Sequence, residues 1–330
     1  MPNAPVVALV GATGLVGSAL LTTLLSATGS ARISHLRVLT TSPASSKLAP
    51  ARAHPSRRVS VHGIRYTAPE TLEEALRGAD VLVSAMGAQS HAEGTYEDNK
   101  ERLLDAAVKA GVKIYVPSEF GTDHNGQNQD VVQSPMFANK QHHHAAAASR
   151  GLQVLAFYSS LITEISFSDW LGIPTSSPSP EWTLPRPAHP VAFTSLRDIG
   201  PMVLSAVLQT HAAAPERTPI PSRLRVCSDL LTLDEAADLW ERAAGGTIQR
   251  SYVDTDGLRE RYEAIKPTLA PGMLGPAIPL MISLGGFDYT ADNSNALLNT
   301  GDYAFEPRTV RDFLEEKARE VGKAEQAGDA

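Results

Sequence analysis

The sequence predicts an α/β protein with a doubly wound parallel sheet and a smaller C-terminal region. Three observations lead to this prediction. Apolar runs alternate with helical periods in the first half, a glycine-rich turn follows the first apolar run, and prolines become frequent after about residue 160. Strands that alternate with helices are typical of parallel sheets with crossover helices. With 330 residues, 42% of them hydrophobic, the chain can bury one large core or two modest ones.

The elements of the first half can be placed from apolar runs and helix ends. Strands are expected at 6–10, 36–40, part of 60–66, 81–85, 114–116 and 153–157. Thr67 and Glu70 have the spacing of a capping box and predict the start of a helix. A helix is also expected at 100–110, where Gly111 provides a C-terminal stop, and Gly151 ends the next one.

The second half has a different texture. Six prolines within 174–190 predict a loop. Beyond it we expect a helix at 198–207, an extended segment at 224–227, a helix capped by Thr232 and Glu235, a helix from Val310 to Val321, and a frayed tail at 322–330. We therefore divide the chain at about residue 160, into 1–160 and 161–330, with the two regions interleaved.

Charge and composition exclude several classes of protein. A net charge of -7 and a pI near 5.8 argue against nucleic-acid and anionic-membrane binding, which need a basic surface. Two uncharged stretches do not predict membrane spans. Glycines and threonines interrupt 1–31, and four prolines interrupt 267–287. The single cysteine, Cys227, allows no intramolecular disulfide, so we expect a reducing, cytoplasmic location.

The glycine turn predicts a site for nucleotide phosphates. Gly11, Gly14 and Gly17 follow an apolar strand and open a helix, in the spacing GxxGxxG. Such glycines allow a tight turn and close approach of a pyrophosphate, which the free amides of the helix N-terminus then bind. We therefore expect a Rossmann-type sheet, with Thr13, Leu15 and Val16 of this turn also contacting the cofactor.

The missing carboxylates favour NADP(H) over NAD(H). The first 69 residues hold seven basic residues and no Asp or Glu, whereas the rest of the chain holds 22 basic and 36 acidic residues. An NAD site uses an acidic residue on the ribose hydroxyl, while a 2′-phosphate needs hydroxyls and cations. Thr41 and Ser42, after the second strand, and the cations Lys47 and Arg52 are the candidates.

Further candidates follow later strands, where ligands of such sheets bind. Small residues after the fourth strand, Ala85, Met86 and Gly87, leave room for the ribose and nicotinamide. After the fifth strand, Ser118, Glu119 and Phe120 should line the crevice. The alternative for Ser118 and Glu119 is a polar turn that caps the following segment.

These motifs give the chain a family resemblance. The turn at 11–17 and the Val-Pro-Ser-Glu-Phe-Gly segment at 116–121 closely resemble the NmrA-like and isoflavone-reductase-like branch of the atypical short-chain dehydrogenases. The similarity continues through Lys140 and the segments 195–200, 231–235 and 308–313. The resemblance implies an NADPH-binding Rossmann domain, a small substrate domain, and a reductase of phenolic or quinone-type molecules.

The resemblance also implies a catalytic lysine, Lys140. On a helix facing the cleft, its ammonium could donate a proton to the oxygen that becomes negative when hydride arrives, and it could contact the cofactor. The residues alone favour an exposed helix lysine. Tyr158, at the end of the sixth strand, could be a second donor or stack near cofactor and substrate, or it could be packing.

Two patterns are treated as misleading. Tyr96 and Lys100 fit the YxxxK of ordinary short-chain dehydrogenases, but they follow the fourth strand rather than the fifth, so we interpret Tyr96 as a helix start outside the reacting layer. Three consecutive histidines at 142–144 suggest zinc, but neighbouring helical residues point 100° apart, so no metal is expected. One of them, taken as His143, could face the substrate.

The leading hypothesis is therefore an NADPH-dependent reductase of a small, apolar, oxygenated aromatic, enone or quinone-type molecule. The alternative is an NADP-sensing regulator without turnover, acting through a protein partner. The presence of Lys140 favours the enzyme. A homodimer or a regulatory protein partner is left open, and the substrate pocket is expected at 170–190 and 267–287.

Overall fold

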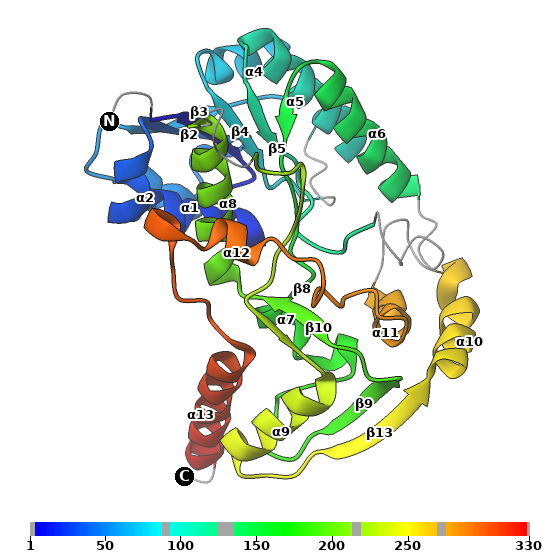
Figure 1. Ribbon diagram of the computed structural model, residues 1–330. Coiled ribbons are helices and arrows are strands. Elements are labelled where there is room, and N and C mark those ends of the chain that lie inside the picture. Colours follow the sequence, from blue (N-terminus) through cyan, green and yellow to red (C-terminus); the bar gives the residue numbers. More distant parts are fainter. Residues whose placement is uncertain (1–3, 88–92, 125–134, 213–218, 269–274, 329–330) are drawn as a thin grey trace.

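A six-stranded parallel sheet forms the centre of the upper lobe of the protein (Figure 1). The computed structural model describes residues 4–87, 93–124, 135–212, 219–268 and 275–328. The strand order is β3-β2-β1-β4-β5-β6. The strands span Val6–Val10 (β1), His35–Thr40 (β2), Val59–Gly63 (β3), Val81–Ser84 (β4), Ile114–Val116 (β5) and Gln153–Val154 (β6). This strand order confirms the predicted doubly wound, Rossmann-type sheet. From β1 the chain builds the sheet outward in one direction through β2 and β3, and then in the other direction from β4 onward.

Helices cover both faces of this sheet (Figure 1). One face carries α1 (Leu15–Leu25), α2 (Ala27–Arg32), the short α3 (Ala49–Arg52) and α8 (Leu196–His211). The other carries α4 (Pro69–Leu76), α5 (Tyr96–Ala110) and α6 (Pro135–Ser149). The strands alternate their apolar side chains between two cores. Val7 and Leu9 enter the core under α1 and α8, whereas Ala8 and Val10 enter the core under α4 and α5.

The lower lobe has a core of its own, around Trp182, Trp240 and Phe193. Its strands are β8 (Leu161–Ile162), β9 (Glu181–Arg186), β10 (Val191–Thr194), β12 (Asp229–Leu231) and β13 (Gln249–Asp254). Its helices are α7 (Thr163–Ser166), α9 (Leu233–Ala244), α10 (Thr255–Ile265), α11 (Ile278–Ser283) and α13 (Val310–Gly328). The capping box of α9 is confirmed, because Thr232 and Glu235 each bond the other's backbone N–H.

Segments beyond residue 160 return to the upper lobe. Helix α8 packs on α1, α12 (Asn295–Leu298) packs on α8, and β11 (Arg223–Arg225) pairs with β7 (Ala156–Tyr158). The close approach of α8 to α1 needs Gly200, because a Cβ there would lie 2.0 Å from Thr23 Oγ1. The two lobes are therefore interleaved along the chain.

Three local expectations were wrong. The proline-rich segment 174–190 contains strand β9, whose one partner among the described strands is β13. Such an edge position tolerates Pro185, which cannot donate to a ladder. Helix α4 starts at Pro69 without a side-chain cap, because the backbone and hydroxyl of Thr67 donate to Glu93 instead of forming a capping box. Helix α13 continues to Gly328, past the expected frayed end. Within the described ranges, no helix is both long and apolar enough to cross a membrane.

Candidate functional site

The glycine turn lies at the carboxyl end of β1, against the end of β4. Gly11 has φ +80°, and a Cβ there would lie 2.4 Å from the carbonyl oxygen of Ala85. At Gly17 a Cβ would lie 2.0 Å from the Gly11 carbonyl oxygen. Gly14 differs, because its φ is -80° and its Cβ would meet nothing closer than 3.4 Å. Gly11 and Gly17 are thus required by the fold, whereas Gly14 leaves space open in front of the helix.

The N-terminus of α1 has the features of a phosphate cradle. Gly14 is the N-cap and offers no side chain to the free N–H groups of the first turn, which Leu15, Val16 and Gly17 provide. Leu15 is 49% exposed although it is a large apolar residue, and Thr13 is half-buried beside it. Open amides beside an uncovered leucine fit a bound dinucleotide phosphate.

The candidates for the 2′-phosphate gather beside this turn. Lys47 Nζ donates to the Thr13 carbonyl oxygen at 3.2 Å, so the cation lies directly at the glycine turn. Arg52 instead donates to the carbonyls of Pro43 and Ser45, at 2.7 and 3.0 Å, and thereby orders the loop. Thr41 and Ser42 are exposed at the end of β2. Lys47 is therefore better placed than Arg52 to meet an anion.

The ends of β4 and β5 are joined at the next part of the crevice. Ser118 Oγ donates to the Met86 carbonyl oxygen at 2.8 Å, which connects the turn after β5 to the segment after β4. Ala85 and Met86 are buried, whereas Gly87 is exposed. The structure thus brings four of the predicted segments to one edge of the sheet: the glycine turn, 85–87, 118–120 and α6.

Glu119 is the centre of a buried cluster of charges. Its side chain is 2% exposed, and its Oε2 lies 3.0 Å from Lys140 Nζ and 3.2 Å from His124 Nε2. Its Oε1 lies 2.9 Å from His144 Nε2. Lys140 also donates to the Ser118 carbonyl oxygen at 3.2 Å, while its side chain stays 13% exposed. The Lys140 ammonium is therefore held in one place, with one side open.

This arrangement determines the ionisation of Glu119. Burial alone would raise the pKa of the carboxyl, but the Lys140 charge, the hydrogen bond from His124 and the close contact of His144 outweigh it and hold the pKa well below its usual range. Glu119 is therefore a carboxylate at neutral pH. This carboxylate fixes the position of the Lys140 amine, and the alternative of a merely capping turn does not fit the buried contacts of Glu119.

Tyr96 lies closer to the site than the sequence suggested. It begins α5, as expected, but its ring is 8% exposed and its hydroxyl shares a hydrogen bond with the Ser118 side chain. Burial and, next, the charge of Glu119 raise the pKa of Tyr96 well above its usual value, so it is a neutral phenol. Lys100 is also buried, with Nζ 5.6 Å from the centre of the Tyr96 ring. The YxxxK spacing of Tyr96 and Lys100 is the sequence signal for this pair, although both follow the fourth strand rather than the fifth.

Two predicted site residues lie elsewhere. His143 is buried between α6, α5 and β5, with Nε2 3.0 Å from the Tyr115 hydroxyl and Nδ1 2.6 Å from Glu101, so it does not face a substrate. The histidine that reaches the cluster is His144, one step around the helix. Tyr158 is 1% exposed and its ring contacts that of His124 edge-on, which is a packing position rather than an open contact for cofactor or substrate.

Unusual backbone follows the cluster. Phe120 and Ser160 have φ of +32° and +54°, a region that non-glycine residues rarely adopt, and Ser160 N–H donates to the Gly121 carbonyl at 3.0 Å. Among the described residues, the buried hydroxyls of Ser159, Ser160 and Thr163 have no hydrogen-bond partner. They lie where the chain passes from β7 to the lower lobe. No pattern in the sequence points to these three hydroxyls.

Comparisons with known proteins give a family match and several relatives of similar sequence. A model described as the NmrA-like family matches residues 4–269. Over 34% of its own length, this chain is 31% identical to Oxidoreductase aprR of Aspergillus flavus. Over 60% of its length it is 28% identical to Eugenol synthase 2 of Clarkia breweri. Over 57% of its length it is 27% identical to the Nitrogen metabolite repression protein nmr of Neurospora crassa. The matches span 38%, 62% and 41% of those relatives, less than two thirds of each.

A solved structure shares the fold over nearly the whole length. It is the binary complex of leucoanthocyanidin reductase with NADPH from Vitis vinifera, with a TM-score of 0.72 and 19% identity, covering 95% of this chain and 99% of that one.

Proposed function

The chain belongs to the NmrA-like family, and from this premise we propose that it is an NADPH-dependent reductase of a small aromatic, enone or quinone-type molecule. The observation that carries the proposal is the combination of the open Gly14 cradle with a lysine fixed on the neighbouring buried Glu119. The similarity to Oxidoreductase aprR and to the NADPH complex of leucoanthocyanidin reductase supports the same reaction class.

The residues present fit NADPH. The first-turn amides of α1 would hold the pyrophosphate, and Lys47, with the hydroxyls of Thr41 and Ser42, would hold the 2′-phosphate. No acidic residue within the first 69 would repel that phosphate. When bound, NADPH supplies a hydride to the substrate. Ala85 to Gly87 and Ser118 to Phe120 would border the ribose and nicotinamide.

In this proposal Lys140 supplies the proton. A substrate oxygen that becomes negative during reduction needs a positioned donor. Lys140 Nζ is held by Glu119 and the Ser118 carbonyl, and its side chain keeps 13% of its surface exposed. Glu119 is a positioning residue here, because its oxygens are engaged by Lys140, His124 and His144.

Residues from the second region would contact the substrate. We infer that 1–160 carries most of the cofactor site and that 161–330 supplies most of the substrate wall. The buried, unpartnered hydroxyls of Ser159, Ser160 and Thr163 mark the point where the first region passes into the second. A single buried thiol, Cys227, fits a reducing compartment such as the cytoplasm.

The test is turnover of NADPH against a panel of aromatic ketones, enones and quinones. Lys140→Ala should lower kcat by about 10²–10⁴-fold, the usual worth of a positioned acid, with little change in NADPH affinity. Tyr96→Phe is the comparison, because its hydroxyl lies at Ser118 and could be a second donor. A nearly silent Lys140→Ala beside an inactive Tyr96→Phe would transfer the proton step to Tyr96.

The second candidate is an NADP sensor that works through a protein partner. It is favoured by the similarity to the Neurospora repression protein. If the wild-type protein binds NADPH but oxidises none with any substrate of the panel, a pull-down with and without NADP should identify a partner whose retention depends on the nucleotide. The oligomeric state, including a homodimer, can be measured in the same samples by light scattering.

A further inference from the structure

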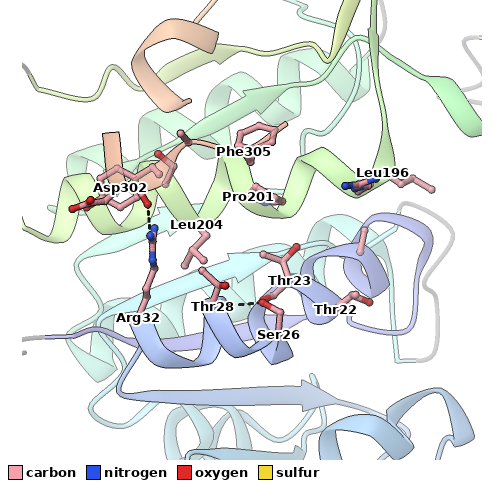
Figure 2. Close-up of a pocket in the computed structure, with 16 residues that line it drawn as sticks. Thr22, Thr23, Ser26, Thr28, Arg32, Leu196, Pro201, Leu204, Asp302 and Phe305 are labelled. Atoms are coloured by element: carbon pink, nitrogen blue, oxygen red, sulfur yellow. Dashed lines mark hydrogen bonds between the residues drawn. The ribbon is translucent and has the colours of Figure 1, made fainter. Parts of the chain in front are cut away.

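A cavity of about 580 Å³ lies on the outer side of α1, away from the site described above. It is lined by α1 and α2 on one side, by α8 on the other, and by the segment 302–305, and it is open to the surface (Figure 2). None of the residues at the glycine turn, at 85–87, at 118–120 or at Lys140 lines it. It is therefore a separate space, and its volume lies within the range of about 300–1,000 Å³ typical of small-molecule sites.

The walls of the cavity divide by chemistry. One side is apolar and consists of Leu196, Pro201 and Leu204 of α8, together with Phe305, as Figure 2 shows. Hydroxyl-bearing residues of α1 and α2 and the turn between them form the opposite side: Thr22, Thr23, Ser26 and Thr28. An apolar surface facing a few polar groups suits a flat molecule with an apolar body.

Two arginines, Arg32 and Arg197, line the cavity. Arg32 stacks on the Tyr303 ring at 5.2 Å and donates to the Asp302 carbonyl oxygen, so a neutral acceptor engages it. Arg197 follows Leu196 in the chain, is exposed, and acts on Asp312 through longer-range charge. Among the described residues, neither guanidinium lies within 4.0 Å of a carboxylate oxygen, although the Arg197 charge also acts on Asp198. Asp302 lines the cavity too, so two arginines face one carboxylate and the lining carries a net positive charge.

We propose that this cavity is a second small-molecule site, which binds an aromatic carboxylate. The ring system would lie against Leu204 and Phe305, and the carboxylate would pair with Arg197 or Arg32. Arginine is suited to this role because its fork of donors matches the two carboxylate oxygens. The proposal does not depend on the reductase assignment, because the two sites share no residue.

Calorimetric titration with biphenyl-4-carboxylate tests the site, in the presence of saturating NADPH so that the cofactor crevice is filled. Biphenyl-4-carboxamide is the matched neutral probe and should bind at least several-fold more weakly. Arg197→Gln should weaken carboxylate binding roughly 3- to 10-fold, the effect of losing one partly exposed charge-assisted pair. Thr28→Trp should abolish binding by filling the cavity from an exposed helix position.

Arg57→Gln is the control, since this exposed arginine lies in the same acid-free stretch but does not line the cavity. It should bind the probe as wild type does. The proposal is overturned by any of three results: no binding at millimolar probe, equal binding of the carboxamide, or unchanged binding by both Thr28→Trp and Arg197→Gln. A folded Gly14→Val chain that still binds the probe would show that this site is distinct from the cofactor site.

Discussion

Replacing Glu119 by Gln removes one buried charge and keeps the shape of the side chain. In the wild type, Lys140, His124 and His144 all contact this carboxylate, and its side chain is only 2% exposed. Removing one partner of a fully buried ion pair costs about 3–5 kcal/mol. Lys140 is 13% exposed and keeps the Ser118 carbonyl, and a glutamine oxygen can still accept one hydrogen bond. We therefore expect a loss of about 2–3 kcal/mol in the free energy of unfolding.

The stability difference between wild type and Glu119→Gln should depend on pH. The folded pKa of Glu119 lies below its ordinary value, so the carboxylate contributes stability that is fully present above a pH of about 4.5. That contribution is lost as the pH falls toward the folded pKa. The difference between wild type and Glu119→Gln should therefore be largest near neutral pH and smaller at a pH of about 3.

Urea unfolding followed by circular dichroism measures the difference at each pH. At pH 7 the midpoint temperature of the variant should also fall by about 4–6 °C, since a chain of this size shifts about 2 °C per kcal/mol. Glu73→Gln is the control, because Glu73 pairs with Lys109 on the surface and should cost at most about 1 kcal/mol. Equal effects of the two changes, or a gap that widens toward acid pH, would refute the buried-cluster argument.

Two further predictions concern the cofactor. Gly14→Val should abolish NADPH binding in calorimetry. The apo variant should melt within a few degrees of wild type, because a Cβ at position 14 meets nothing closer than 3.4 Å. Gly17→Ala should instead destabilise the fold, because a Cβ at position 17 would lie 2.0 Å from a carbonyl oxygen. Thr41→Asp should weaken NADPH binding by about 1–3 kcal/mol and leave NADH binding unchanged or stronger, because a carboxylate would stand beside the 2′-phosphate. Tighter binding of NADH than NADPH by the wild type would contradict the argument from missing acids.

Elements fixed by their neighbours in the chain could be predicted. The glycine turn, the parallel strands and the capping box of α9 depend on apolar runs, on backbone conformations open to glycine, and on a hydroxyl three residues before a carboxylate. Each of these is a local property. The same locality explains the errors at Thr67 and Pro185, since Glu93 and strand β13, both distant in sequence, provided the deciding partners.

The sequence by itself determined the fold class, the place of the glycine turn, and the single lysine on the helix after β5. It could state that at most one of three consecutive histidines faces a given site, but not which one. That choice depends on the rotation of α6 about its axis, and the packing of His143 against Tyr115 and Glu101 sets the rotation that turns His144 toward Glu119. The burial of Glu119 and the approach of Tyr96 to Ser118 were likewise decided only by tertiary structure, because both join segments whose distance in space no local pattern encodes.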